Sequence, residues 1–372
     1  MMKKGGNEIL PRRESRRGRG AGFALIVVLI VIAALGFLAG SFAFSMKVES
    51  RLAANAQAEA DLQWLGRSGV EAARFVLAES LRYPSGRHTS LNQLWAGGPG
   101  EPQETNGPLA LVRLNDLKLG GGRLSVHIVD LERYANINRA DPILLNRAFE
   151  VIGVDASTAV TAVDSILDWM DSDDDPRMNG AESDYYLALP APYFPKNGPV
   201  DELSELLLVH GISPAVYWGA KLRWHRFQWA RGETSWDPEE ANPYSIGLVD
   251  LFTPCSSGMV NINTASAEVL QILPGIDETL AQNIVRVRAG PDGVEGTEDD
   301  TPFLDIGMLN PAVVPGLPPP ELLQGMRRFI TVQSRTFQVT VDARLGNARR
   351  RFHAVLVRLN PAVVETVEFW WE

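Results

Sequence analysis

The feature that most constrains this chain is an uncharged apolar segment near its N-terminus. Residues 23–46 contain no charged side chain, and the first one after them is Lys47. As a helix this segment would be about 36 Å long, enough to cross the ~30 Å hydrocarbon core of a bilayer. The leader before it carries seven basic and two acidic residues. Because basic flanks stay in the cytoplasm, we expect a single-pass protein with a cytoplasmic N-terminus and its remaining residues across the membrane.

A small residue stands before this apolar run rather than after it. A conventional signal peptide is cut behind its apolar core, but a cut after Gly22 would leave the apolar helix on a chain that begins with Phe23. The basic leader, the Gly-Phe pair and the run FALIVVLIVIAALGF resemble the signal of type IV prepilins, so the chain resembles pilins and pseudopilins. An ordinary single-pass anchor is the alternative.

One residue departs from the common pilin pattern. Most pilins have Glu at the fifth mature position, which is Val27 in this chain. By resemblance, that exception belongs mainly to the K-type minor pseudopilins of type II secretion. The resemblance implies that a prepilin peptidase removes residues 1–22 and that Phe23 becomes N-methylated.

The composition is that of a globular chain with an acidic surface. A hydrophobic fraction of 45% and a charged fraction of 22% suit a chain that buries a core, and 372 residues allow two or three domains. The formal net charge is −10, and it becomes −15 without the leader, which disfavours nucleic acid and anionic lipid as partners. Cys255 is the sole cysteine, so an intramolecular disulfide is excluded.

Helix signals continue beyond the apolar run. Apolar residues repeat at three- and four-residue steps as far as Leu77, before a stretch that contains Pro and Gly. We therefore predict one long helix from Phe23 to about Arg82, embedded in membrane first and packed on a globular domain later. A break at Gly66 or Gly69 would instead give two helices.

Alternating apolar side chains predict strands in two distant parts of the chain. One strand covers 124–129, and the others cover 337–342, 352–359 and 363–371, with a hairpin turn at Gly346-Asn347. The predicted fold class is α+β, a pilin-like long N-terminal helix plus an antiparallel sheet, with a large inserted all-helical domain. The predicted division of the chain is a leader (1–22), the membrane part of the helix (23–46), two pieces of the pilin-like domain (47–132 and 326–372) and the inserted domain (133–325).

The middle segment contains an internal repeat. Residues 134–141 (YANINRAD) recur as residues 259–266 (MVNINTAS), and each copy joins Asn-Ile-Asn to a capping-type Asp or Ser and a helical run. The second copy continues through Pro274-Gly275 into another helix, as in a helix-hairpin-helix unit. A domain of duplicated helix-hairpin-helix (SAM-like) units is the simplest account.

Hairpins of this kind often bind the nucleic-acid backbone, and the second copy resembles the hairpin of competence-type DNA receptors. Charge disfavours that use here, because residues 133–325 contain 11 basic and 29 acidic side chains and phosphate binding relies on cations. We expect a structural use of the motif and no nucleic-acid partner. A membrane-tethered helix-hairpin-helix protein for DNA binding or uptake is the alternative function.

An acidic loop follows each copy. Carboxylates at this density repel one another unless they are solvated or bridged by a hard cation, and Ca²⁺ suits them because both loops lack His and Cys. The first loop is not a true EF-hand, since Pro176 stands where that motif requires Gly. A solvated loop without a metal is the alternative. The candidate Ca²⁺ ligands are Asp171, Asp173, Asp175, Glu182 and Asp184 in the first loop and Asp292, Thr297, Asp299 and Asp300 in the second.

Catalytic motifs find little support in the sequence. The five histidines are scattered, Cys255 has no His near it, and neither a nucleophile elbow nor a P-loop is present. We therefore expect no enzyme activity. Residues 217–236 interleave aromatic with basic side chains, which favours packing within the helical domain or a protein interface.

Taken in order along the chain, these features resemble the K-type minor pseudopilins over essentially the whole length. The resemblance implies a non-enzymatic subunit that initiates and caps the tip of the periplasmic pseudopilus, which drives export of folded proteins across the outer membrane. It also implies the inner membrane of a Gram-negative bacterium as the location. The implied partners are the I- and J-type minor pseudopilins, then the H-type, the major pseudopilin, the prepilin peptidase and the inner-membrane assembly platform.

Overall fold

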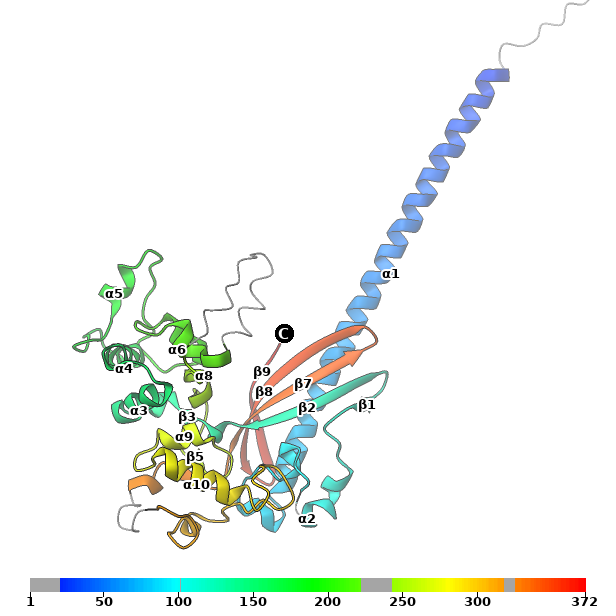
Figure 1. Cartoon of the computed structure of the whole chain (residues 1–372). Coiled ribbons are helices and arrows are strands. Elements are labelled where there is room, and N and C mark those ends of the chain that lie inside the picture. Colours follow the sequence, from blue (N-terminus) through cyan, green and yellow to red (C-terminus); the bar gives the residue numbers. More distant parts are fainter. Residues whose placement is uncertain (1–20, 101, 222–242, 318–324) are drawn as a thin grey trace, which may run out of the picture. The chain divides into compact units, whose positions relative to one another are not determined.

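A computed structural model gives the fold of residues 21–100, 102–221, 243–317 and 325–372 (Figure 1). The chain divides into two compact units, Met1–Asp61 and Leu62–Glu372. Nearly all of the predicted leader and most of the aromatic and basic segment 217–236 lie outside the described residues.

Helix α1 is one continuous helix, Ala21–Ser80, so the prediction of a single long helix is confirmed. Its part within the first unit is long and apolar enough to cross a membrane. The side chains of residues 23–46 are all exposed in the structure. An apolar surface on every side of a helix is typical of a segment that faces lipid.

The second unit contains a five-stranded antiparallel sheet in the order β1-β2-β7-β8-β9. The predicted strands are confirmed, and the hairpin between β7 and β8 turns at Gly346, whose φ is 57°. Strands β2 and β7 are direct neighbours, with Asp130 opposite Phe337, although the whole middle segment lies between them in sequence. The strand bounds are Leu117–Leu119 (β1), Gly122–Asp130 (β2), Thr336–Leu345 (β7), Ala348–Asn360 (β8) and Val363–Trp371 (β9).

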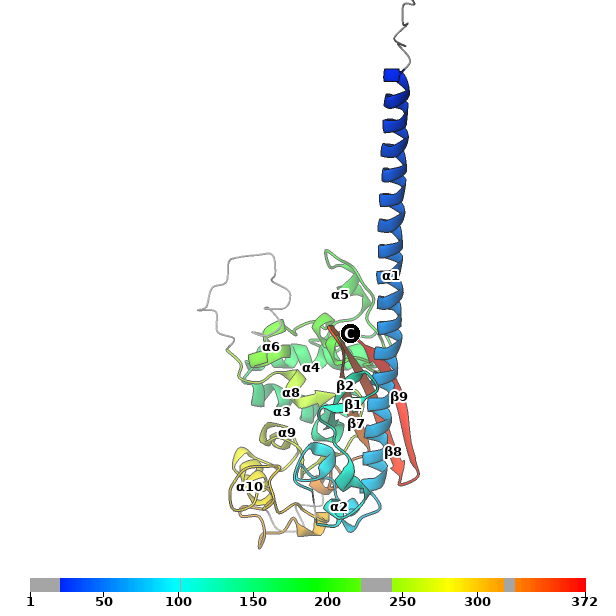
Figure 2. The same ribbon diagram turned by 90° about the vertical axis from the view of Figure 1, so that its right-hand side faces the viewer.

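The C-terminal part of α1 packs on this sheet (Figure 2). A Cβ atom on Gly66 would lie 2.4 Å from ring atoms of Phe352, and one on Gly69 would lie 2.5 Å from a methyl carbon of Val341. Both glycines therefore allow the helix backbone to approach the sheet closely, and neither breaks the helix.

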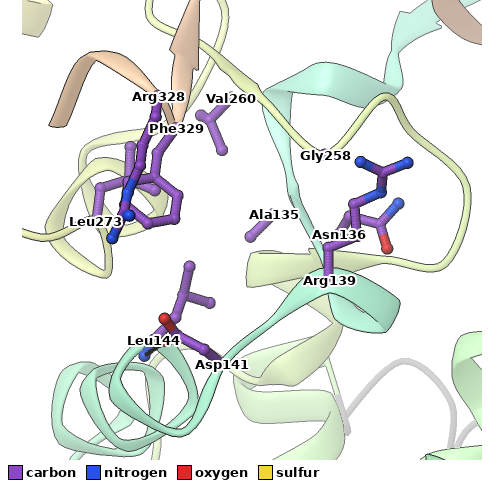
Figure 3. A pocket seen from close by; sticks show the side chains of 10 residues that line it. All are labelled: Ala135, Asn136, Arg139, Asp141, Leu144, Gly258, Val260, Leu273, Arg328 and Phe329. Carbon is purple, nitrogen blue, oxygen red and sulfur yellow. Dashed lines mark hydrogen bonds between the residues drawn. The ribbon is translucent and has the colours of Figure 1, made fainter. Parts of the chain in front are cut away.

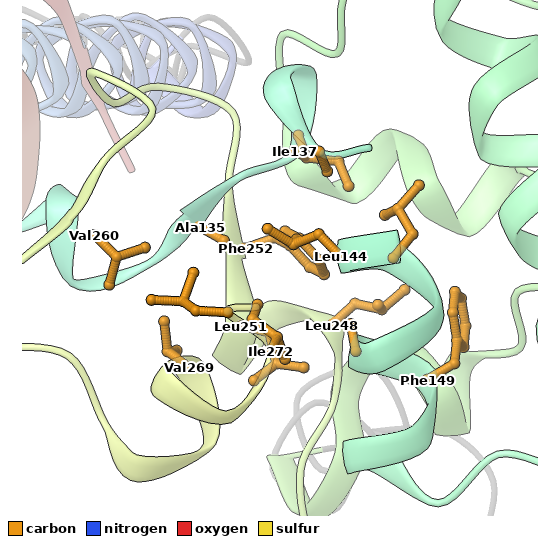
Figure 4. Close-up of a cluster of buried hydrophobic side chains, with 14 of the residues drawn as sticks. Ala135, Ile137, Leu144, Phe149, Leu248, Leu251, Phe252, Val260, Val269 and Ile272 are labelled. Atoms are coloured by element: carbon orange, nitrogen blue, oxygen red, sulfur yellow. The ribbon is translucent and has the colours of Figure 1, made fainter. Parts of the chain in front are cut away.

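The middle segment folds into short helices around a core of its own. Side chains of both repeat copies meet there: Ile137, Leu144 and Phe149 come from the first copy, and Val269 and Ile272 from the second (Figure 4). The helices are Pro142–Ile152 (α3), Ala156–Met170 (α4), Ser183–Leu187 (α5), Pro214–Trp218 (α6), Leu248–Leu251 (α8), Ala267–Gln271 (α9) and Glu278–Arg288 (α10), while Pro102–Thr105 (α2) precedes β1.

The predicted caps of the repeat are confirmed. Asp141 accepts the N–H of Leu144 at the start of α3 (2.9 Å), and the Ser266 hydroxyl accepts the N–H of Val269 at the start of α9 (3.3 Å). Each cap satisfies a backbone donor that the first helical turn leaves without a partner.

The prediction of an all-helical middle segment was wrong in one respect. The segment contains three short strands, Ala135–Asn136 (β3), Phe252–Thr253 (β4) and Val260–Asn261 (β5), of which β3 pairs in parallel with β4, and β5 pairs in parallel with Ile330–Thr331 (β6) of the C-terminal piece. The start of each Asn-Ile-Asn stretch is buried in extended form. Its backbone polar groups therefore need partners, which a second extended segment supplies.

Candidate functional site

The first acidic loop is fixed at both ends. It begins with Asp171, directly after α4. Beyond the loop, Asn138 of the first repeat copy donates from Nδ2 to the carbonyl of Val200 (2.9 Å) and accepts the N–H of Val200 at Oδ1 (2.7 Å). This pair of hydrogen bonds returns the chain to the start of the repeat, so the acidic side chains between the two ends are held together.

Three of the predicted Ca²⁺ ligands converge in this loop. Asp171, Asp173 and Glu182 each offer one carboxylate oxygen, and these oxygens lie within 4.8 Å of one another. Among the described residues, no other group of three or more His, Cys, Asp or Glu side chains converges in this way. Asp175 and Asp184 lie outside the group, and the N–H of Asp175 donates to Asp173 (3.1 Å).

Glu182 is the buried member of the group. The residue is 3% exposed, and neither carboxylate oxygen has a hydrogen-bond partner among the described residues. Burial raises the pKa of Glu182 to about 7, and the negative charges of Asp168 and Asp171 add to the rise. A buried carboxylate without a partner is unfavourable, so the surroundings of Glu182 suit a cation.

Two residues of this site were missed in the sequence. Asp168 is fully buried in α4 and accepts a hydrogen bond from Nη1 of Arg177 (2.6 Å), and the same nitrogen donates to Asp171 (2.6 Å). Asp173 and Glu182 have no cationic partner among the described residues. The signal for Asp168 was a single acidic residue within the apolar stretch ILDWM.

The donor set fits a hard divalent cation. Ca²⁺ takes six to eight oxygen ligands from carboxylates, carbonyls and water. The group supplies three carboxylates without a nitrogen or sulfur donor. Asp171, Asp173 and Glu182 would hold the ion, and its charge would offset their mutual repulsion.

The second acidic loop uses its carboxylates differently. Asp299 accepts the N–H of Asp292 (3.0 Å), and Asp300 accepts that of Gly296 (2.8 Å). The hydroxyl of Thr297 donates to Asp299 (2.7 Å), which lowers the pKa of Asp299. The predicted ligands of this loop thus stabilise its own turns, and the described structure does not bring them into a converging group.

The Pro-Gly hairpin of the second copy is bound from within the protein. Arg147 of α3 donates to the carbonyl of Leu273 in the hairpin (2.6 Å). Asp277 caps the helix that follows by accepting the N–H of Leu280 (2.8 Å). A phosphate at the start of this helix would be repelled by the carboxylate of Asp277. The hairpin therefore serves to join the two repeat copies, through Arg147, rather than to bind nucleic acid.

A pocket of about 310 Å³ lies between the two repeat copies (Figure 3). Arg139 and Arg328 lie on different sides of it, and its one carboxylate, Asp141, is engaged as the cap of α3. The pocket lining therefore offers no side chain placed as a nucleophile or as a free general base.

Buried carboxylates also join the middle segment to the sheet. Asp130 at the end of β2 accepts hydrogen bonds from the hydroxyls of Thr264 and Ser334 (2.6 Å each). Glu132 accepts the N–H of Thr336 (2.9 Å), and burial together with the charge of Asp130 raises the pKa of Glu132 to about 7. The segment is thus fastened to the sheet by a polar network whose charge depends on pH.

The remaining sequence candidates lie apart from the acidic group. Cys255 is half-buried, and burial raises the pKa of its thiol. Tyr217 is buried with its ring edge-on to Trp218, their centroids 4.6 Å apart. The described part of the aromatic segment therefore packs in the core of the middle segment.

Several known proteins that are similar to this chain are described as protein K of the type II secretion system. A family model for protein K of the type II secretion system matches residues 114–223, and a helix-hairpin-helix motif model matches residues 256–298. The type II secretion system protein K of Pectobacterium carotovorum subsp. carotovorum is 24% identical, over 95% of this chain and 96% of the relative. That of Aeromonas hydrophila is 25% identical (91% and 93%), and that of Pseudomonas aeruginosa is 26% identical (92% and 90%).

A solved structure has the same fold. It is a chain in the crystal structure of the GspK-GspI-GspJ complex from the type 2 secretion system of enterotoxigenic Escherichia coli. The TM-score is 0.60 at 17% identity, over 86% of this chain and 98% of that chain. The similarity to protein K of the type II secretion system therefore runs along nearly the whole of this chain and of these relatives.

Proposed function

We propose that this chain is a minor pseudopilin that initiates and caps the tip of the periplasmic pseudopilus, the fibre that drives export of folded proteins across the outer membrane. The observation that carries the proposal is Val27. In the pilins that this chain resembles, Glu at this position neutralises the buried N-terminal ammonium of a neighbouring subunit, since an isolated charge in lipid costs several kcal/mol. A subunit with Val27 cannot make that pair, so it need not enter below an existing subunit.

The middle segment supports a tip position. We infer that residues 133–325 form one inserted domain of duplicated helix-hairpin-helix (SAM-like) units, between the pilin-like pieces 47–132 and 326–372. Its core is formed by side chains of both repeat copies. A domain of this size on the subunit would block stacking of a further subunit above it.

The location and partners follow from the same proposal. Residues 23–46 would cross the inner membrane of a Gram-negative bacterium, with the N-terminus in the cytoplasm and the rest in the periplasm. The role is structural rather than enzymatic. The chain would join the I- and J-type minor pseudopilins, as GspK does in the complex with GspI and GspJ. It would then meet the H-type subunit, the major pseudopilin and the inner-membrane assembly platform.

Intact mass tests the proposed processing. The full chain expressed with a prepilin peptidase should lose residues 1–22 and gain one methyl group at Phe23, while expression without the peptidase leaves it uncut. A Gly22→Val variant should stay uncut in both. A wild-type chain that keeps its leader beside an active peptidase would instead be an ordinary membrane-anchored protein.

Composition of the purified complex tests the tip position. Full-length chain co-expressed with the I- and J-type subunits and the major pseudopilin should copurify with one copy each of the two minor subunits. Several copies of this chain along a fibre of the major pseudopilin would place it in the shaft and contradict the proposal. Binding of duplex DNA at low salt would favour the DNA-uptake alternative.

We also propose that the first acidic loop binds Ca²⁺ through Asp171, Asp173 and Glu182. Support comes from their convergence and from the buried, unpartnered carboxylate of Glu182. Calorimetric titration of the full chain should give one Ca²⁺ site that is lost in Glu182→Gln and kept in Asp184→Asn, a neighbouring carboxylate outside the group. Equal binding by both variants would contradict this assignment.

A further inference from the structure

Four basic residues form a row across the sheet, which we call the basic ladder: Lys118 of β1, Arg123 of β2, Arg344 of β7 and Arg349 of β8. Each is directly opposite the next in the strand register. Residues opposite one another point to the same face of a sheet. The flanking Leu124 and Ala343 are buried toward α1, so the ladder lies on the face away from that helix, and all four side chains are exposed.

The ladder is short of compensating charge. Arg123 pairs with Asp116, and Arg349 pairs with Asp342 (2.9 Å), which Arg351 shares (3.3 Å). Neither Lys118 nor Arg344 has an ion-pair partner among the described residues. The guanidinium of Arg123 lowers the pKa of Asp116, with Lys118 and Arg344 adding to the effect.

Such a row is unfavourable for the isolated chain. Like charges directly opposite one another on a sheet destabilise it, and the chain as a whole carries a net charge of −10. A surface that served solubility alone would intersperse both signs. The arrangement is therefore better explained by a ligand that brings several negative charges to this face.

We propose that the basic ladder is a docking surface for an α-helix of another protein that carries carboxylates along one face. With neighbouring strands ~4.8 Å apart, the ladder is about 14 Å long. Carboxylates at positions i, i+3 or i+4, and i+7 of a helix lie about 5–6 Å apart on one side, so three helical turns match the ladder in length and spacing. An extended strand would present same-face residues every ~6.7 Å and would lose this match.

The width of the site also favours a single helix. A helix is about 10 Å across, so it would cover the ladder and little beyond it. Duplex DNA or a membrane would extend over neighbouring surfaces of a chain with 45 acidic and 35 basic residues, where repulsion opposes binding. Arginine suits the task because its planar fork binds a carboxylate through two hydrogen bonds.

Binding of designed peptides to the full chain in detergent tests the surface. One helical peptide carries Glu at i, i+3, i+7 and i+10, and its isomer has the same residues with Glu spread around the helix. We expect the striped peptide to bind more tightly, with an affinity that falls as salt rises. Arg123→Gln combined with Arg344→Gln should weaken this binding about tenfold.

Matched variants make the outcome decisive. Arg286→Gln combined with Arg327→Gln removes two exposed arginines outside the ladder and should leave peptide binding unchanged. The ladder variant should melt close to wild type at low salt, because it relieves repulsion between like charges while losing one exposed ion pair, Arg123–Asp116. Equal affinity for both peptides, or equal loss in both double variants, would overturn the proposal. Preferred binding of phosphatidylglycerol vesicles over the striped peptide would make the ladder a lipid-binding surface instead.

Discussion

Asn263 and Phe303 form a reciprocal pair of hydrogen bonds: Nδ2 of Asn263 donates to the carbonyl of Phe303 (2.9 Å), and the N–H of Phe303 donates to Oδ1 of Asn263 (2.8 Å). Asn138 makes the same pair with Val200 from the same place in the first repeat copy. Helices α3 and α4 and an acidic loop lie between Asn138 and Val200, and α9, α10 and the second acidic loop lie between Asn263 and Phe303, while α5 is an addition in the first copy. The duplication therefore extends beyond the repeated octapeptide: in each copy, an Asn side chain fixes the segment that follows the acidic loop through two hydrogen bonds.

Removal of the Asn263–Phe303 pair of hydrogen bonds should destabilise the protein. Asn263→Ala would leave the buried N–H and carbonyl of Phe303 without their partner, so we expect the free energy of unfolding to fall by about 2–4 kcal/mol. Urea unfolding of the full chain in detergent measures this. Asn146→Ala removes one surface bond within α3 and should change stability by less than ~0.5 kcal/mol. Similar losses of unfolding free energy in both variants would show that the Asn263–Phe303 pair has no special role in stability.

A methyl group added on the sheet-facing side of α1 should lower the stability of the protein, whereas one added on the exposed N-terminal part of α1 should not. Gly66→Ala places Cβ against the ring of Phe352, and overpacking of this kind costs about 1–3 kcal/mol. Gly36→Ala has no neighbouring atom within 4 Å of the new Cβ and gains helix propensity of up to about 1 kcal/mol. Thermal unfolding of the two variants should therefore shift in opposite directions, and a Gly66→Ala chain as stable as wild type would refute the close approach.

Helix α1, strands β2, β7, β8 and β9, and the helix caps were predictable because their signals are local, whereas the three-residue strand β1 was not predicted. The apolar repeat of α1, the two-residue alternation of β7 and β8, and the Gly346 turn each depend on a few adjacent residues. Asp141 and Ser266 stand directly before apolar helical runs, where a capping residue is expected.

Stability should fall as the pH rises through neutrality. The folded pKa of Glu132 is about 7, above its ordinary value of 4.5, so its contribution is complete below pH 4.5 and is lost as pH rises through 7. Asp130 and Arg358 share its surroundings. At 1.36 kcal/mol per pKa unit, the loss between pH 5 and 8 is about 3 kcal/mol at most. Urea unfolding at several pH values should show this slope.

Variants identify the group behind that slope. Glu132→Gln should flatten the decline, whereas Glu365→Gln, on the exposed part of β9, should leave it unchanged. Glu182 also has a pKa of about 7, so some slope should remain in Glu132→Gln. A decline that Glu132→Gln does not alter would assign it to other groups.

Arg177 should matter most without Ca²⁺. Arg177→Gln removes the cation beside the buried Asp168, and we expect a loss of about 2–3 kcal/mol in the presence of a chelator. If Ca²⁺ binds at the neighbouring carboxylates, its addition should restore part of that loss in a melting experiment. Arg133→Gln, a cation elsewhere in the middle segment, should show neither effect. Equal melting of Arg177→Gln and wild type would show that the Arg177–Asp168 pair adds nothing to stability.

The acidic group and the basic ladder were less accessible from the sequence because they depend on long-range geometry. Composition pointed to the candidate ligands in the first loop. It could not separate Glu182, which is buried, from Asp184, which is exposed, because burial depends on how the chain folds between Asp171 and Val200. The ladder aligns residues from four strands at both ends of the chain. A shift of one residue in any of these strands would turn its cation to the other face.

The face of α1 that carries Gly66 and Gly69 is synthesised before strands β7, β8 and β9, which help to cover it. Strand β7 begins at Thr336, more than 260 residues after Gly69, and β9 ends at Trp371. Because a chain is synthesised from its N-terminal end, this apolar face is still uncovered while the strands are being made. A chain that ended before β7 would keep this apolar face of α1 exposed to solvent. Addition of β7, β8 and β9 is thus the step that covers this face of α1.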